Sequence, residues 1–297
     1  MPTVHKASSI EPVLQSAPWA ELPVEITMDI LQRLGTTEIL ESAQRVCSTW
    51  WKVCHDPAMW RVIDLKYDPN SHMRGVLNKI CRIAVDRSQG QLLKISIGSK
   101  DLLNYIADRS SQRRHLRLVN CGNVAGGLVS AAKNFPLLEE LHAHLTFITA
   151  EDIESVGRYC PLLKSFTLNA SRCSTIGYSL STDDGQALAV ATSMPELRHL
   201  ALLLNPLTNV GLQAILDGCP HLVSLDLRHS NVDLEGDLGR RCRQQIVDLK
   251  QPHDSTQDYE FDSKIHYYYG CWSDDEYEYQ DYLSNIGRYI DSENENW

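Results

Sequence analysis

Large apolar residues recur at every fourth position near the start of the chain. The four positions are Leu22, Ile26, Ile30 and Leu34. Because an α-helix completes a turn in about 3.6 residues, this spacing puts the four side chains on one stripe of a helix. Pro23 is tolerated in a first helical turn, and Gly35 follows the last apolar residue as a stop signal. The pattern predicts a helix from about Pro23 to Leu34.

Two more short helices are predicted directly after the first. Thr36 and Thr37 carry hydroxyl groups that can cap the second helix. We expect this helix to direct inward Leu40, Ala43, Val46 and Cys47. A third helix passes through Trp50, and Asp56-Pro57 is typical of the cap and first position of a last turn, which ends at Trp60. A unit this small buries little surface alone, so we expect a neighbouring domain or a partner on its apolar face.

In order and spacing, these residues resemble the F-box family. The matching positions are Leu22-Pro23, Glu25-Ile26, Ile30-Leu31, Leu34, Val46-Cys47, Trp50 and Asp56-Pro57-x-x-Trp60. The resemblance implies a docking module for the Skp-type adaptor of a cullin–RING ubiquitin ligase. The adaptor contacts that it implies are Leu22, Pro23, Ile26, Ile30, Leu34 and Trp50. The alternative interpretation is a helical bundle whose apolar residues only form a core.

Past Trp60 the pattern changes to alternation, and then to repeats. A strand is predicted to Leu65 and a helix over about 72–87. Four segments then align, namely PLLEELHA from Pro136, PLLKSFTL from Pro161, PELRHLAL from Pro195 and PHLVSLDL from Pro220. Their third, sixth and eighth positions are apolar, which is the L-x-x-L-x-L pattern of leucine-rich repeats. Weaker units are predicted near 92–97 and 246–249, and Arg113 stands at an apolar position of the unit around 115–121.

Each repeat also carries a polar position and a helix start. Three residues past the last apolar position stand Cys121, Thr146, Ser171, Asn205 and Ser230. Such side chains can hydrogen-bond backbone groups that stacked turns leave unpaired. Helices are predicted to start near Thr149, Thr182, Thr208 and Ser230-Asn231. Cys160 and Cys219, just before a repeat proline, are expected to be small buried hydrophobic residues.

An F-box followed by such repeats resembles the plant F-box/LRR-repeat proteins, over residues 19–250. The resemblance implies an α/β fold, in which a three-helix F-box precedes a leucine-rich-repeat solenoid with parallel strands on the concave face and helices on the convex face. The domains expected are 1–18, a flexible leader; 19–60, the F-box; 61–250, the solenoid; and 251–297, an acidic, Tyr-rich and mostly disordered tail.

Alternate residues of each repeat strand should point to the open concave face, because the leucines point inward. These alternate positions mix charged, imidazole and small polar side chains with few apolar residues. We hypothesise a surface for a protein target that is centred on Arg117, His142, His144, Asn169, Asp226 and Arg228. The alternative is a solvated face with binding by loops, such as the insertion around 172–180 with Tyr178.

The negative charge of the chain lies in its last segment. From Asp254 onward, twelve acidic residues stand against two basic ones, which accounts for the whole formal charge of −10. The neutral remainder argues against binding to nucleic acid, which needs a basic face. High charge and few aliphatic residues predict disorder, with Ile286 and Ile290 as the alternative contacts to the end of the solenoid. The tail is interpreted as solubilising, or as a segment for phosphorylation or for a basic partner.

Other patterns exclude several classes of function. Nine scattered cysteines without a secretory signal indicate reduced thiols and a location in the nucleus, the cytoplasm or both. The chain has no run of eighteen apolar residues, so no membrane contact is expected. His142-x-His144 resembles the beginning of a metal site but lacks further ligands at a suitable spacing. No catalytic or phosphate-binding motif appears, so neither enzymatic activity nor a cofactor is expected.

The function predicted from these observations is that of a non-catalytic subunit. By its resemblance, the F-box would bind the Skp-type adaptor and, through it, the cullin and RING subunits, while the repeats hold a protein target for ubiquitination. The alternative is a non-degradative interaction scaffold built on the repeats. A small-ligand sensor, as in the auxin-receptor group of F-box/LRR proteins, would need a longer solenoid and a basic pocket.

Overall fold

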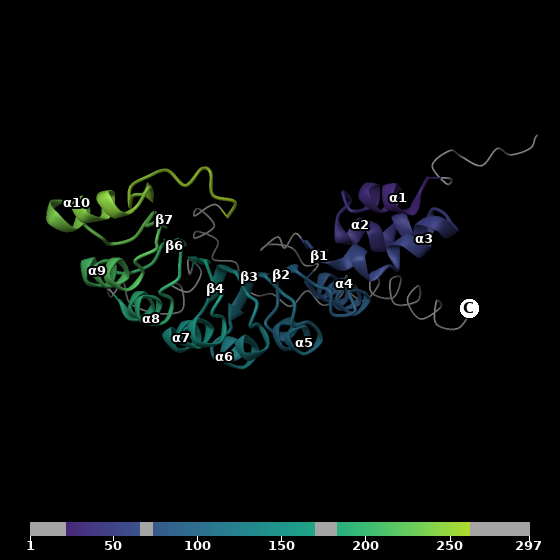
Figure 1. The fold of residues 1–297 in the computed structure, drawn as a ribbon, viewed down its shortest axis with the longest axis horizontal. Coiled ribbons are helices and arrows are strands. Elements are labelled where there is room, and N and C mark those ends of the chain that lie inside the picture. Colours follow the sequence, from purple (N-terminus) through teal and green to yellow (C-terminus); the bar gives the residue numbers. More distant parts are fainter. Residues whose placement is uncertain (1–21, 66–73, 170–182, 262–297) are drawn as a thin grey trace, which may run out of the picture.

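A parallel sheet lines the inner side of an arc (Figure 1). The computed structural model describes residues 22–65, 74–169 and 183–261. In these ranges the sheet has eight strands, which follow one another in chain order. The strands are β1 (Val62–Ile63), β2 (Lys94–Ile97), β3 (His115–Asn123), β4 (Glu140–Phe147), β5 (Ser165–Asn169), β6 (His199–Leu203), β7 (Ser224–Asp226) and β8 (Asp248–Lys250). Each strand pairs in parallel with the next, and the predicted solenoid is confirmed.

Helices cover the outer, convex side of the sheet (Figure 1). They are α4 (Arg74–Arg87), α5 (Asp101–Arg109), α6 (Gly127–Ala131) with the short turn η4 (Ala132–Asn134), α7 (Ala150–Tyr159), α8 (Gly185–Ser193), α9 (Asn209–Gly218) and α10 (Gly236–Gln245). The capping predicted at Thr149 and Thr208 is confirmed, because each hydroxyl oxygen accepts a bond from a backbone N–H of its helix. The start predicted at Ser230-Asn231 is wrong, since α10 begins at Gly236 and residues 230–235 have no regular secondary structure.

The repeat leucines form the core between the strands and the helices. The sixth and eighth positions of the four aligned segments are 2% exposed or less, and the third positions are 3% exposed or less. Cys160 and Cys219 are buried as predicted, and each thiol donates to a backbone carbonyl of the preceding repeat. Burial raises the pKa of Cys160 to about 12 and that of Cys219 to about 11, so both stay neutral thiols at physiological pH.

The polar position of the repeats does hydrogen-bond backbone groups, but not in every repeat. The Thr146 hydroxyl accepts from the Cys121 N–H (3.1 Å) and donates to the His144 carbonyl (2.9 Å). The Asn205 side-chain oxygen accepts from the Leu207 N–H (3.1 Å). The Ser230 hydroxyl is enclosed and has no partner in the described part of the chain. Ser171 lies outside the described residues.

The F-box helices stand at one end of the arc (Figure 1). They comprise α1 (Val24–Leu31), α2 (Thr36–Glu41), η2 (Ala43–Arg45), α3 (Ser48–Cys54) and η3 (Pro57–Trp60). The predicted cap of the last turn is confirmed, as the Asp56 carboxylate accepts from the Ala58 N–H at 2.8 Å. The second helix ends at Glu41, earlier than predicted, and the tight turn after it directs Val46 outward, where it is 50% exposed.

The first long solenoid helix, α4, ties the F-box to the repeats. Its Arg87 donates to the side-chain oxygen of Gln44 at 2.9 Å and lies 5.6 Å from the centre of the Trp60 ring. The Leu93 N–H donates to the Arg61 carbonyl at 2.8 Å, and β1 follows at once as the first strand of the sheet. One hydrophobic core therefore runs from Leu31 through the repeats, and the neighbouring domain expected under the F-box is the solenoid itself.

Several predictions fall on residues that the structure does not describe. These are the leader 1–18, the insertion around 172–180 with Tyr178, the helix start at Thr182, and Ile286 and Ile290 of the tail. In the described ranges, none of the helices combines the length and the apolar character needed to cross a bilayer.

Candidate functional site

The outer side of α1 carries exposed apolar side chains. Thr27 and Leu31 are the residues of α1 that face the core, while Ile26 is 47% and Ile30 41% exposed. Two apolar residues at successive turns of one face would ordinarily be covered, since burying such a side chain contributes about 1.5–3 kcal/mol. This face of the F-box is therefore available to another polypeptide.

The six predicted adaptor contacts differ in exposure. Pro23, Ile26 and Ile30 are exposed, whereas Leu22, Leu34 and Trp50 are half-buried. Leu34 and Trp50 pack against the core and so also support the F-box itself. Two further apolar side chains of the F-box, Val46 and Trp51 (41%), are also exposed, and neither was predicted as an adaptor contact.

The concave face has the register that the repeat alignment predicted. Arg117 pairs with His142, His142 with Thr167, Thr167 with Ala201, and Ala201 with Asp226, so one row crosses five strands. The neighbouring row contains Val119, His144, Asn169 and Leu203. Five of the six predicted target-binding residues thus lie in two adjacent rows of the sheet, and Arg228 follows two residues after the end of β7.

Residues 254–261, which the sequence placed in a disordered tail, lie against this concave face. After β8 the chain turns back, and the Pro252 carbonyl accepts from the His229 N–H at 2.8 Å. Tyr259 is half-buried and Phe261 is 8% exposed, which is unusual for side chains beyond the last repeat. We call this segment the C-terminal strap. The tail was predicted to begin at 251, but residues 251–261 pack against the solenoid.

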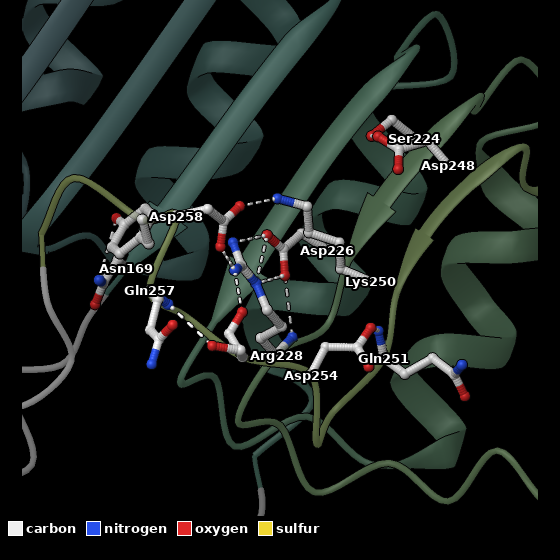
Figure 2. A network of polar contacts seen from close by, with 12 residues as sticks. Asn169, Ser224, Asp226, Arg228, Asp248, Lys250, Gln251, Asp254, Gln257 and Asp258 are labelled. Carbon is white, nitrogen blue, oxygen red and sulfur yellow. Dashed lines mark hydrogen bonds and ion pairs between the residues drawn. The ribbon is translucent and has the colours of Figure 1, made fainter.

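Arg228 joins the sheet to the C-terminal strap (Figure 2). Its guanidinium donates to the Asp226 carboxylate from Nε (3.0 Å) and Nη2 (2.7 Å), in a bidentate pair. Its Nη1 donates to the Ser255 carbonyl (2.7 Å) and to the Asp258 carboxylate. Asp258 also accepts from Lys250 Nζ at 2.6 Å, and both bonds lower the pKa of this carboxyl to about 2. The Arg228 side chain is only 2% exposed and that of Asp226 13%, whereas the Asp258 side chain is 56% exposed.

His144 and Asn169 hold Tyr259 of the strap. The Asn169 side-chain amide donates to the Tyr259 hydroxyl at 3.1 Å, and that hydroxyl lies 2.5 Å from Nδ1 of His144. The hydroxyl accepts from Asn169 and can donate its one proton to Nδ1, which suits a neutral His144 with its own proton on Nε2. Burial, with smaller contributions from Arg117 and His142, lowers the pKa of His144 to about 3, in agreement with a neutral ring.

Arg117 and His142 complete the site. Arg117 forms an ion pair with Glu260 of the strap and lies 5.0 Å from the centre of the Phe261 ring. Phe261 also contacts the His144 ring, with the two centres 4.6 Å apart. His142 approaches Thr167 (2.9 Å) and Glu140 (3.4 Å), and burial lowers its pKa.

The six residues predicted to bind a target are thus brought together, but they are not an open surface. His144, Asn169 and Arg228 are buried, and the C-terminal strap covers them. Among the residues that the structure describes, no group of three or more His, Cys, Asp or Glu side chains is placed to hold a metal ion. The site offers the cations of Arg117 and Arg228 and the ring of His144, and the strap meets them with carboxylates and aromatic rings.

Comparison with known proteins agrees with both parts of the fold. A family model described as F-box-like matches residues 19–66. Over 80% of its length, the chain is 49% identical to F-box/LRR-repeat protein 23 of Arabidopsis thaliana, and it spans only 54% of that protein. It is 45% identical to the F-box protein SKIP19 of the same plant, over 84% of this chain and 82% of the relative. F-box/LRR-repeat protein 22 is 42% identical, over 82% of this chain and 80% of the relative.

Proposed function

The chain belongs to the F-box/LRR-repeat proteins, and on this basis we propose that it is a substrate receptor of an SCF-type ubiquitin ligase. The F-box would bind the Skp-type adaptor, and the concave face of the repeats would bind a protein target. Proteins of this family are typically non-catalytic, so the chain would contribute proximity. Holding a target lysine near the ubiquitin donor makes the encounter effectively intramolecular.

The exposed apolar face of α1 is the observation that carries this proposal. The F-box is already packed on the solenoid through Arg87, Trp60 and β1, so fold stability does not require Ile26 or Ile30 to be covered again. Their exposure at one end of the arc leaves room for an adaptor without obstruction of the concave face (Figure 1). A non-degradative scaffold remains the second candidate, since it would use the same concave face.

Adaptor binding by the purified full-length chain tests the proposal. Ile26→Asp combined with Ile30→Asp is expected to weaken the Kd for a plant Skp-type adaptor at least 100-fold, because two apolar contacts are lost and two charges are introduced. Isothermal titration calorimetry measures the Kd. Val210→Asp, at an exposed valine of α9 (65%), is the matched control and should bind like the wild type. Equal binding by both variants, with unchanged circular dichroism, would favour the scaffold.

A further inference from the structure

The C-terminal strap crosses the sheet rather than extending it. From its origin after β8 it contacts Arg228 beyond β7, Asn169 of β5, His144 of β4 and Arg117 of β3. Backbone bonds of the strap close local turns, from Asp254 to Gln251 and from Tyr259 to Thr256. The contacts to the strands are made by side chains, as in a peptide bound across a receptor surface.

Four consecutive side chains of the strap each meet a matching group. Asp258 binds Arg228 and Lys250, and Glu260 binds Arg117, so each carboxylate has a cation. Tyr259 is bound through its hydroxyl, and Phe261 lies between His144 and Arg117. The order is acidic, aromatic, acidic, aromatic. Such an alternating match indicates recognition, because a solubilising acidic tail needs no aromatic partners.

The receptor groups are costly to leave without a ligand. Both described bonds of Arg228 Nη1 go to the strap, and the guanidinium is buried. A buried charged donor that loses its acceptor costs more free energy than a neutral donor in the same position. The site thus favours an occupant with carboxylates, and the strap supplies one.

The strap is also built to be exchanged. The Asp258 and Glu260 side chains are 56% and 65% exposed, and exposed ion pairs contribute little. Of the four side chains only that of Phe261 is fully buried, and segments with few buried contacts open at a low cost in free energy. A tethered ligand of this kind competes as if at millimolar concentration, so an external ligand binds more weakly than it would to an empty site.

We propose that the concave site between Arg117 and Arg228 recognises a turned acidic–aromatic segment of a protein target, with the chemistry of Asp-Tyr-Glu-Phe. Residues 258–261 occupy this site as an internal competitor. The inference rests on the proposed function only in taking the concave face as the target-binding surface. A target that carries the segment displaces the strap, and a protein without it is excluded.

A peptide titration with the full-length chain tests this inference. The probe is a fluorescein-labelled peptide with the sequence of residues 254–261, DSTQDYEF. Tyr259→Ala combined with Phe261→Ala empties the site, and we expect this variant to bind the peptide at least tenfold more tightly than the wild type. Gln257→Ala, a change to an exposed side chain of the same strap, is the matched control and should leave the wild-type affinity unchanged.

Two further variants and an altered peptide test whether the peptide binds specifically, and they cover the case in which the double alanine variant does not fold. Adding Arg117→Glu to the emptied variant should weaken peptide binding at least tenfold, and a peptide with both aromatic residues replaced by alanine should not bind. If the double alanine variant does not fold, Glu260→Lys opens the strap by charge reversal against Arg117 and should raise the peptide affinity severalfold.

The inference is overturned if the folded, emptied variant binds the peptide no better than the wild type, or binds the alanine peptide equally well. Adaptor binding is measured on the same preparations. Loss of the peptide effect with intact adaptor binding overturns only this inference. Loss of adaptor binding with an intact peptide effect overturns only the proposed ligase function.

Discussion

Individual side chains of the concave face have protonation states that depend on the C-terminal strap. His144 is enclosed between the strands and the strap, and its Nδ1 can accept a hydrogen bond from the Tyr259 hydroxyl. A second proton on the ring would break this bond and place a charge near Arg117. Burial, with smaller contributions from the charges of Arg117 and His142, lowers the pKa of His144 to about 3, against an ordinary value near 6.5.

We predict that acid weakens the fold through His144. His144 has a pKa near 6.5 in the unfolded chain and about 3 in the folded chain, so between these pH values the unfolded chain binds more protons. The contribution of His144 to the free energy of unfolding is therefore fully present above pH 6.5 and is lost as the pH falls toward 3. Between pH 6.5 and pH 5 this group alone removes about 2 kcal/mol from the free energy of unfolding. His142, whose pKa is also lowered, acts in the same direction.

Urea unfolding of the wild type and of His144→Asn at both pH values measures this effect. The asparagine oxygen can accept from Tyr259 but does not titrate, so the variant should lose about 2 kcal/mol less than the wild type on acidification. Equal losses in the two proteins would show that His144 titrates normally.

Single residues also show how far the sequence could predict the structure. The repeat pattern predicted the buried leucines and the row that contains Arg117 and His142, because strand alternation is a local property. The same pattern marked Arg113 as irregular but could not explain it. The structure shows Arg113 fully buried, donating to the carbonyls of Ile106 and Ser110 and lying 4.3 Å from the Phe135 ring centre. These partners come from two repeats, and no local pattern joins them.

The same backbone turn recurs in four repeats of the solenoid, although the sequence did not predict it. Asn120, Leu145, Leu204 and His229, each two residues past the last apolar motif position, all have positive φ angles between 52° and 57°. The left-handed conformation costs a non-glycine residue about 1–2 kcal/mol. Leucine at this position gives no signal of a turn, so only the fold shows that the geometry recurs.

We predict that glycine is tolerated at Leu204. Its side chain is half-buried, and relief of the left-handed strain should offset the lost contacts. Leu204→Gly is expected to change the free energy of unfolding by no more than about 0.5–1 kcal/mol. Ala201→Gly, in β6 with ordinary strand geometry, is the control and should cost about 1 kcal/mol. Chemical unfolding compares the two, and a much larger loss at 204 would show that the turn stores no strain.

The convex helices pack closely through glycine. A Cβ atom at Gly218 of α9 would stand 2.1 Å from the Ala191 carbonyl oxygen of α8, and one at Gly157 of α7 would stand 2.4 Å from the Ser193 carbonyl oxygen. Backbone atoms cannot move aside as a flexible side chain can. The spacing of neighbouring repeats is therefore set partly by residues without side chains.

We predict that Gly218→Ala destabilises the solenoid by about 1–3 kcal/mol, despite the higher helix propensity of alanine. Gly127→Ala in α6 is the control, since its new atom would meet the Leu103 side chain at an ordinary 3.5 Å. Thermal unfolding should show a clear loss of Tm for the first variant and little change for the second. A rise in Tm for Gly218→Ala would mean that the helices are free to separate.

At the scale of the whole molecule, the two surfaces that we propose for the adaptor and the target lie apart. The apolar face of α1 lies at one end of the arc, and the concave site lies along its inner side (Figure 1). The F-box signature predicted the first surface, because its residues lie within forty positions of the chain. The second was predicted only in part. The contact between Tyr259 and His144 spans 115 residues, and an acidic segment gives no indication of which basic residues it meets.

Hydrogen exchange of the full-length chain, alone and with a Skp-type adaptor, tests most directly whether these surfaces act separately. We expect the adaptor to slow amide exchange over residues 22–51 and to leave the exchange rates of strands β3 to β7 and of the C-terminal strap unchanged. Protection of the concave strands, or none over 22–51 in a complex that demonstrably forms, would contradict this prediction.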